Sequence, residues 1–373
     1  MAEIEVLKLA GWQKILPQEL GRFHSKMLSP AGINELLIRK LLYQTCTDQS
    51  YRLTALGWDF VSHLGFSAVK DSRYVVSGSK LQRRKEAALI SFTLFRAGIN
   101  IFTDTPDALA TPLAYLSSAA ARRNTKVIGS KLWAGNRLAG IACMSETAYM
   151  VHFLNGQGMF FTSEMDLFHK LAFRSAKTAC IYAADSYEQA VRCLKAPQQE
   201  SLRGGCISFR DAFGKTTLPV HLLECSDVGV MQLQIMSRPN YREELARLAL
   251  GNAFTPPLAS LPDADAMTEG VPLVIGVDMD IKRLERACLT AKAQGFAKTL
   301  LLLLPKQLPA LGLLFHTLGA EFCAAPEKAL REQWYLVPYE PSEEPYQTAE
   351  GRFIHASDIP TRRKAGRPHK PTT

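Results

Sequence analysis

The chain has 373 residues, 47% of them hydrophobic, and a formal net charge of +9, which excludes an intrinsically disordered chain and predicts two or three domains. The longest apolar runs, residues 299–304 and 308–315, fall far short of the roughly 18 residues that a membrane helix needs. The start lacks a signal-peptide pattern, so we expect a cytoplasmic protein with no membrane partner. The eight cysteines include no C-x-x-C pair, which is typical of buried thiols rather than a zinc site.

The positive charge lies at the two ends of the chain. Residues 1–100 hold 14 Lys and Arg against 8 Asp and Glu, and residues 362–373 hold 5 against none. The rest of the chain is therefore slightly acidic. A basic excess confined to the ends favours contact with a polyanion there, whereas the near-neutral middle folds on its own. Basic ends that only keep the protein soluble are the alternative.

The first elements predict a helix-turn-helix. Pro17 suits the first turn of a helix that runs to Phe23, and the segment 29–32 breaks it. Apolar residues at helical spacing then predict a second helix over residues 33–44, whose other face is polar. Two short helices joined by a Gly-containing turn place the second helix where it can enter the major groove of DNA.

The next residues predict a turn over 47–50, a short strand over 51–53, and Thr54 as the N-cap of a further helix. The string YRLTALGWDF, residues 51–60, is similar to the junction between the second wing strand and the closing helix of a winged helix. Residues 16–65 resemble the winged-helix part of proteins carried on plasmids and conjugative elements of Gram-positive bacteria, including replication-relaxation proteins. The resemblance implies double-stranded DNA as the partner, with a relaxase or replication protein beside it.

Four residues of this region are candidate DNA contacts. Asn34 and Arg39 would face base edges, because an amide can pair with adenine and a guanidinium with guanine. Lys40 and Arg52 would take phosphates. A winged helix that contacts another protein instead is the alternative, since the fold is widely reused.

Residues 80–98 predict a helix that begins with a basic patch of Lys80, Arg83, Arg84 and Lys85. Positive charges at a helix start oppose the helix dipole, so an external anion would relieve them. The DNA backbone is one candidate for that anion, and an acidic loop of the protein is the other.

The middle of the chain predicts a mixed α/β body. A β-hairpin is expected over residues 138–144 and 148–154, and residues 252–270 read as a linker or long surface loop. Further strands are predicted over 178–183, 218–223, 229–236, 271–277 and 299–304, and helices over 163–174, 187–194, 281–294 and 308–318. The alternation of strands and helices after residue 271 predicts a parallel sheet.

Asp278 and Asp280 follow a buried strand and offer an alternative, catalytic hypothesis. With Glu224, which ends another apolar strand, they resemble a degenerate toprim-like centre that holds Mg²⁺ for phosphoryl transfer. Against this, Cys225 stands where a glycine is usual, and two aspartates before a helix also serve simply as caps. The sequence holds no P-loop, G-x-S-x-G or H-E-x-x-H motif, so we expect no catalysis and no cofactor.

The last residues predict a disordered linker and a basic tail. Residues 338–361 are rich in Pro and Glu. The tail resembles the AT-hook, an element that binds the minor groove of A·T-rich DNA; the residues that match it are Lys364, Gly366, Arg367, Pro368 and Lys370. Ala365 replaces the usual arginine before the glycine, which predicts reduced affinity. A tail that only aids solubility is the alternative.

Together these patterns predict an α+β or α/β protein with four parts: a winged helix over 1–72, a basic helix and connector over 73–130, an α/β domain over 131–336, and a disordered linker and tail over 337–373. We expect a DNA-binding protein of a mobile genetic element that acts in replication, transfer or transcriptional control. A metal-dependent phosphoryl-transfer enzyme and a structural factor that binds proteins are the alternatives.

Overall fold

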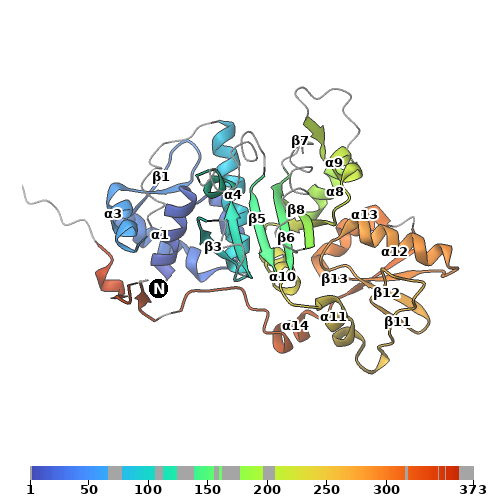
Figure 1. Ribbon diagram of the computed structural model, residues 1–373. Coiled ribbons are helices and arrows are strands. Elements are labelled where there is room, and N and C mark those ends of the chain that lie inside the picture. The colour runs from blue at the N-terminus through green and yellow to red at the C-terminus, as the bar shows by residue number, and fades with distance from the viewer. Residues whose placement is uncertain are drawn as a thin grey trace, which may run out of the picture. The chain divides into compact units, whose positions relative to one another are not determined.

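The computed structural model describes residues 2–65, 78–105, 112–123, 138–154, 159–161, 177–195, 206–315, 318–342, 344–348 and 350–360. The chain forms two compact units (Figure 1). Unit 1 consists of residues 1–89 together with residues 340–373, and unit 2 consists of residues 90–339.

Unit 1 is built mainly from short helices and one hairpin. Its elements are α1 (Ala2–Gln13), the 3₁₀ helices η1 (Gln18–Arg22) and η2 (Lys26–Leu28), α2 (Pro30–Ile38), β1 (Leu42–Gln44), β2 (Tyr51–Leu53), α3 (Ala55–His63) and the first half of α4 (Ser79–Arg96). Strands β1 and β2 pair antiparallel, and Leu16 exchanges two backbone hydrogen bonds of 2.9 Å with Tyr51 at the hairpin edge. Helix α1 has no counterpart in the prediction, and the expected helix from Pro17 is only the 3₁₀ turn η1.

The C-terminal segment of unit 1 lies beside α1 in Figure 1, and Lys8 sits over the ring of Tyr346 at 4.8 Å. It contains β15 (Tyr346–Gln347), β16 (Phe353–Ile354) and η8 (Ala356–Asp358), within residues predicted as a linker. Ile354 and Ile359 are buried. Part of the predicted linker is therefore a packed element of unit 1.

Helix α2 differs from the predicted helix at both ends. Ser29 is its N-cap and accepts a hydrogen bond from the Gly32 amide at 3.2 Å, so the expected break over 29–32 is instead the start of the helix. The helix ends at Ile38 rather than at residue 44, because Lys40 adopts a left-handed conformation (φ 59°) and the Leu41 amide donates to the Leu36 carbonyl. The residues after this turn form strand β1.

Unit 2 contains a six-stranded sheet in the order β10-β8-β6-β5-β4-β3. The strands are β3 (Asn100–Thr103), β4 (Ala114–Ser117), β5 (Gly140–Met144), β6 (Thr147–Phe153), β8 (Lys177–Ala184) and β10 (Val220–Glu224). Strands β6, β8 and β10 run parallel, whereas β5 and β6 form the predicted antiparallel hairpin. The helices α5 (Ser118–Arg123), α8 (Tyr187–Lys195) and α9 (Phe209–Lys215) and the strand pair β7 (Met159–Phe161) and β9 (Cys206–Ser208) accompany this sheet.

A four-stranded sheet completes unit 2, in the order β11 (Ala266–Thr268), β12 (Val271–Ile275), β13 (Thr299–Leu303) and β14 (Ala320–Ala324). Strands β12, β13 and β14 are parallel, as expected. Its helices are α10 (Asp227–Met236), α11 (Tyr241–Leu250), α12 (Ile281–Ala293), α13 (Leu308–Phe315) and α14 (Glu327–Gln333). Figure 1 shows α12 and α13 on one side of this sheet and α11 on the other, and each side has its own apolar core.

Two predictions for unit 2 are wrong. Residues 229–236 form helix α10 and not a strand: Ser226 caps the helix, and almost every residue from Gly229 to Met236 is buried, so no helical periodicity shows in the sequence. Residues 252–270 contain strand β11 as well as loop. The expected helix over 163–174 lies outside the described residues.

The fold is a mixed α/β fold, as the element pattern predicted. Within the described part of the chain, no helix is both long and apolar enough to cross a membrane. Among the described cysteines, Cys180, Cys225 and Cys288 are buried and Cys46 is exposed.

Candidate functional site

The surface of α2 presents the first of the candidate DNA contacts. Asn34 is exposed on the helix and Lys40 is exposed just beyond it. Ile38, at the last position of the helix, is an apolar side chain with 66% of its surface exposed. Polar and apolar groups are therefore both available on this surface, as base edges and thymine methyl groups would require.

Arg39 is less available than the sequence suggested. Its Nε donates to Glu35 Oε1 at 2.6 Å, and its Nη1 donates to the backbone carbonyl of Ile359 at 3.2 Å. It caps the end of α2 instead of lying on the face of a longer helix. Its expected base contact stays a prediction, because these contacts would have to be exchanged for contacts to DNA.

The β1–β2 hairpin is organised around Asp48. This carboxylate accepts hydrogen bonds from the hydroxyls of Thr45 and Ser50 and pairs with Arg52 at 3.1 Å. Burial raises the pKa of Asp48, but the hydrogen bonds from Thr45 and Ser50 and the charge of Arg52 outweigh it and hold the pKa at about 2. Asp48 therefore stays ionised and holds the Arg52 side chain, which is only 11% exposed, against the hairpin.

The basic start of α4 lies against this hairpin within unit 1. Lys85 Nζ donates to the backbone carbonyl of Asp48 at 3.2 Å and pairs with Glu19 at 3.4 Å. Burial, and then the nearby charge of Arg52, lowers the pKa of Arg84. Arg84 makes no ion pair among the described residues. Arg52, Arg84 and Lys85 therefore share two carboxylates, those of Asp48 and Glu19. The Nε atom of Arg52 is buried and has no hydrogen-bond partner in the described part of the chain.

We call Arg52, Arg84 and Lys85 the hairpin cluster. The structure brings together these three residues, which come from two predicted patches more than 30 positions apart, whereas Arg83 is exposed beside them on α4. Sequence reasoning placed Arg84 and Lys85 in one basic patch but did not bring Arg52 to it. The predicted tail contacts Lys364, Gly366, Arg367, Pro368 and Lys370 lie outside the described residues.

The three acids of the catalytic alternative do not form one cluster. Asp280 is the N-cap of α12 and accepts from the Arg283 amide at 3.2 Å, which is the capping role that the sequence allowed. Glu224 accepts from the backbone amide of Tyr187 at 3.3 Å. Nowhere in the described ranges do three or more Asp, Glu, His or Cys residues group in a way that could hold a metal ion.

The carboxylate of Asp278 is buried, and side chains of the protein already supply its hydrogen bonds. It accepts from the hydroxyl of Tyr241 at 2.5 Å and from Nε of Arg242 at 2.9 Å. Burial raises the pKa of Asp278, but Arg242 outweighs this effect and holds the pKa well below its usual range. Asp278 therefore acts as a fixed anion for Arg242, not as an open metal ligand.

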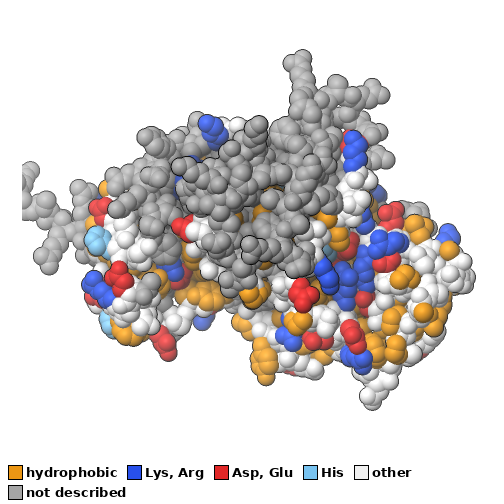
Figure 2. All heavy atoms as spheres, in the orientation of Figure 1, with side chains coloured by type: hydrophobic (Ala, Val, Ile, Leu, Met, Phe, Trp, Pro, Cys, Tyr) orange, Lys and Arg blue, Asp and Glu red, His pale blue; other side chains and the backbone are white. Residues whose placement is uncertain are grey.

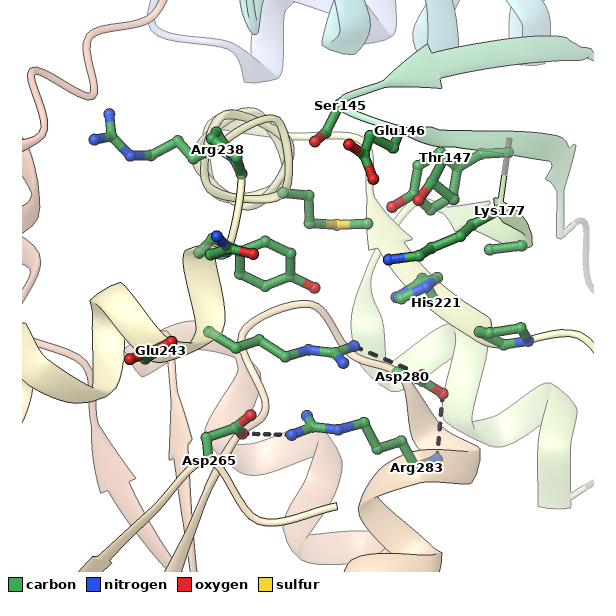
Figure 3. A pocket seen from close by; sticks show the side chains of 18 of the residues that line it. Ser145, Glu146, Thr147, Lys177, His221, Arg238, Glu243, Asp265, Asp280 and Arg283 are labelled. Atoms are coloured by element: carbon green, nitrogen blue, oxygen red, sulfur yellow. Dashed lines mark hydrogen bonds and ion pairs between the residues drawn. The ribbon is translucent and has the colours of Figure 1, made fainter. Parts of the chain in front are cut away.

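Arg242 also lines a polar pocket of unit 2 that sequence reasoning missed (Figure 3). Lys177, His221, Arg242 and Arg283 come from four separate elements or loops of that unit. Sequence reasoning had singled out Asp280, which also lines this pocket, but it gave no signal for these four residues, because none of them belongs to a short motif.

The chain was compared with family models, curated proteins and solved structures, and none of them matches it.

Proposed function

We propose that this chain is a cytoplasmic DNA-binding protein of a mobile genetic element, and that unit 1 holds the duplex without catalysis. The observation that carries the proposal is the hairpin cluster: Arg84 and Lys85 of α4 lie against Arg52 of the hairpin, and Arg84 is half-buried without a carboxylate partner among the described residues. Phosphates of a DNA backbone would supply the missing negative charge.

The order of elements in unit 1 supports a winged helix as the DNA-binding fold. The bridge at Leu16, the turns η1 and η2, the capped helix α2, the β1–β2 hairpin and the closing helix α3 follow one another along the chain. In such a fold the last helix before the hairpin enters the major groove, and the hairpin contacts the backbone. We therefore assign α2 to base contacts and the hairpin cluster to phosphates. The processes we propose are replication, transfer or transcriptional control, beside a relaxase or replication protein.

The first test asks whether the chain selects a DNA sequence. The full-length protein is used to enrich a pool of random duplexes, and the enriched site is then measured by fluorescence anisotropy. Replacing Asn34 and Lys40 with alanine removes exposed side chains and should leave the unfolding curve unchanged. We expect this variant to lose at least tenfold in affinity for the enriched site. If no duplex is enriched, the proposal is wrong.

The second test separates backbone contacts from base contacts. Arg84→Ala should weaken every duplex alike and flatten the slope of log affinity against log salt by about 0.9 for the lost phosphate contact. Lys306→Ala is the matched control, because it removes one exposed charge from unit 2. Equal slopes for the two variants would exclude the hairpin cluster as the phosphate site.

The third test concerns the tail. If its five basic residues contact DNA, truncation after Thr361 should flatten the same slope by roughly 3 to 5 and reduce the preference for A·T-rich duplexes. A tail that only aids solubility predicts unchanged slopes and more aggregation of the truncated protein.

A further inference from the structure

The polar pocket of unit 2 lies between its two sheets and encloses about 660 Å³. Its walls come from the β5–β6 turn, the starts of β8 and β10, the loop between α10 and α11, and the first turns of α12. The pocket faces the carboxyl end of β12, which is where open α/β sheets place their ligands. Figure 2 shows Lys and Arg side chains gathered beside Asp and Glu side chains on the described face of unit 2. The volume lies in the range of small-molecule sites.

Asp278 fixes the positions of two groups that line this pocket. Its side chain holds Arg242, and its backbone carbonyl accepts a hydrogen bond from Nδ1 of His221 at 2.9 Å. The hydrogen on Nδ1 leaves Nε2 of His221 as the ring atom that can accept a further hydrogen bond. His221 is 97% buried, yet it lines the pocket, and Nε2 has no hydrogen-bond partner within the described part of the chain.

Most of the other charges in the pocket are paired with one another. Arg283 pairs with Asp265, and Arg286 pairs with Asp263 at 2.6 Å. Asp280 caps α12 and lies 3.8 Å from Arg242. These pairs hold the arginines rigidly while leaving some of their N–H groups unused.

Lys177 differs from these residues. It is exposed at the start of β8 and makes no ion pair among the described residues. Figure 3 shows Lys177 and His221 both pointing into the pocket. The carboxylate of Glu146, from the β5–β6 turn, lines the same wall. The pocket thus offers an unpaired cation, an anchored guanidinium and an imidazole, with carboxylates beside them.

We propose that this pocket binds a small organic phosphate that carries hydroxyl groups and has the size of a mononucleotide. The phosphate lies against Lys177 and Arg242, which can donate charge-assisted hydrogen bonds, and Nε2 of His221 accepts a hydrogen bond from a hydroxyl group of the ligand. The hydroxyl groups of the ligand donate hydrogen bonds to the carboxylates of Asp280 and Glu146. Inorganic phosphate has no such hydroxyl groups, so these two carboxylates would only repel it. The mixed charge of the walls therefore favours an organic phosphate over inorganic phosphate. This inference does not depend on DNA binding by unit 1.

The experiment is isothermal titration of the full-length protein with the four ribonucleoside 5′-monophosphates. Adenosine and inorganic phosphate are titrated as fragments of the ligand. At least one mononucleotide should bind, and both fragments should bind at least tenfold more weakly. Lys177→Ala should weaken binding about tenfold, because one charge-assisted hydrogen bond is lost. Lys195→Ala is the matched control: it removes an exposed lysine at the end of α8 and should change nothing.

A second variant tests the histidine. His221→Asn keeps an amide donor where Nδ1 donates to the carbonyl of Asp278 but cannot reach the position of Nε2, so it should fold and bind at least fivefold more weakly. The proposal is overturned if no mononucleotide binds at millimolar concentration, if inorganic phosphate binds as tightly, or if Lys177→Ala behaves like its control. The last titration uses a 5′-phosphorylated oligonucleotide. If Lys177→Ala weakens binding of the oligonucleotide but not of any mononucleotide, the assignment to a free nucleotide is overturned.

Discussion

Replacing Asp48 with asparagine should destabilise the hairpin of unit 1 and at the same time strengthen DNA binding. The folded pKa of Asp48 is about 2, against 3.8 for the free side chain, and each unit of pKa is worth about 1.36 kcal/mol. The ionised carboxylate therefore contributes about 2 kcal/mol. Because the folded pKa is depressed, this contribution is present above pH 4 to 5, falls to about half near pH 3, and is almost lost at pH 2.

The assay is hydrogen exchange of peptides that cover residues 40–65, converted to opening free energies at pH 6 and pH 3. Asp48→Asn should lower the opening free energy by about 2 kcal/mol at pH 6 and by about half as much at pH 3. Asp59→Asn, which alters an exposed carboxylate of α3, is the control. If both variants exchange alike at pH 6, the network around Asp48 does not hold the hairpin. In duplex binding, Asp48→Asn should gain affinity, because it removes a negative charge beside Arg52 and Lys85.

Two further predictions concern unit 2 and use urea unfolding. Gly229→Ala should lower the free energy of unfolding by at least about 2 kcal/mol, because a β-carbon there would lie 1.8 Å from a backbone carbonyl oxygen. Gly214→Ala is the control: its β-carbon would meet nothing within 4 Å, so it should be neutral or stabilising. Similar urea midpoints for the two variants would contradict the packing of α10. Asp278→Asn should lower the free energy of unfolding by about 3 to 5 kcal/mol, because Arg242 loses its buried partner. A decrease below about 1 kcal/mol would show that this ion pair does not hold the pocket residues in place.

The sequence was sufficient to predict elements with a clear period or a clear cap. Strand β12, helix α12 and the N-cap at Thr54 follow the predicted pattern, and Thr54 accepts from the Gly57 amide at 3.1 Å. The end of α2 was missed because a lysine, Lys40, takes the left-handed position that a glycine usually marks. Helix α10 was missed because it is buried on nearly every side.

The sites were less predictable than the elements. The sequence identified Arg52, Arg84 and Lys85 as basic, but only the fold brings Arg84 and Lys85 of α4 against the hairpin that carries Arg52. The buried carboxylate of Asp278 is paired with Arg242, which lies 36 positions away in the sequence. Partners at such a distance are set by tertiary packing, which no local pattern encodes.

The composition of unit 1 from two distant segments has a consequence for its biosynthesis. Arg39 donates to the carbonyl of Ile359, and Ser25 donates to Glu340 at 3.2 Å, so residues near the end of the chain complete a unit that begins at its start. The 250 residues of unit 2 separate the two segments. At a translation rate of about 5 to 20 residues per second, the ribosome needs roughly 12 to 50 s to synthesise them. The first segment of unit 1 therefore waits for this time before its last packing partners emerge, and unit 2 can fold first.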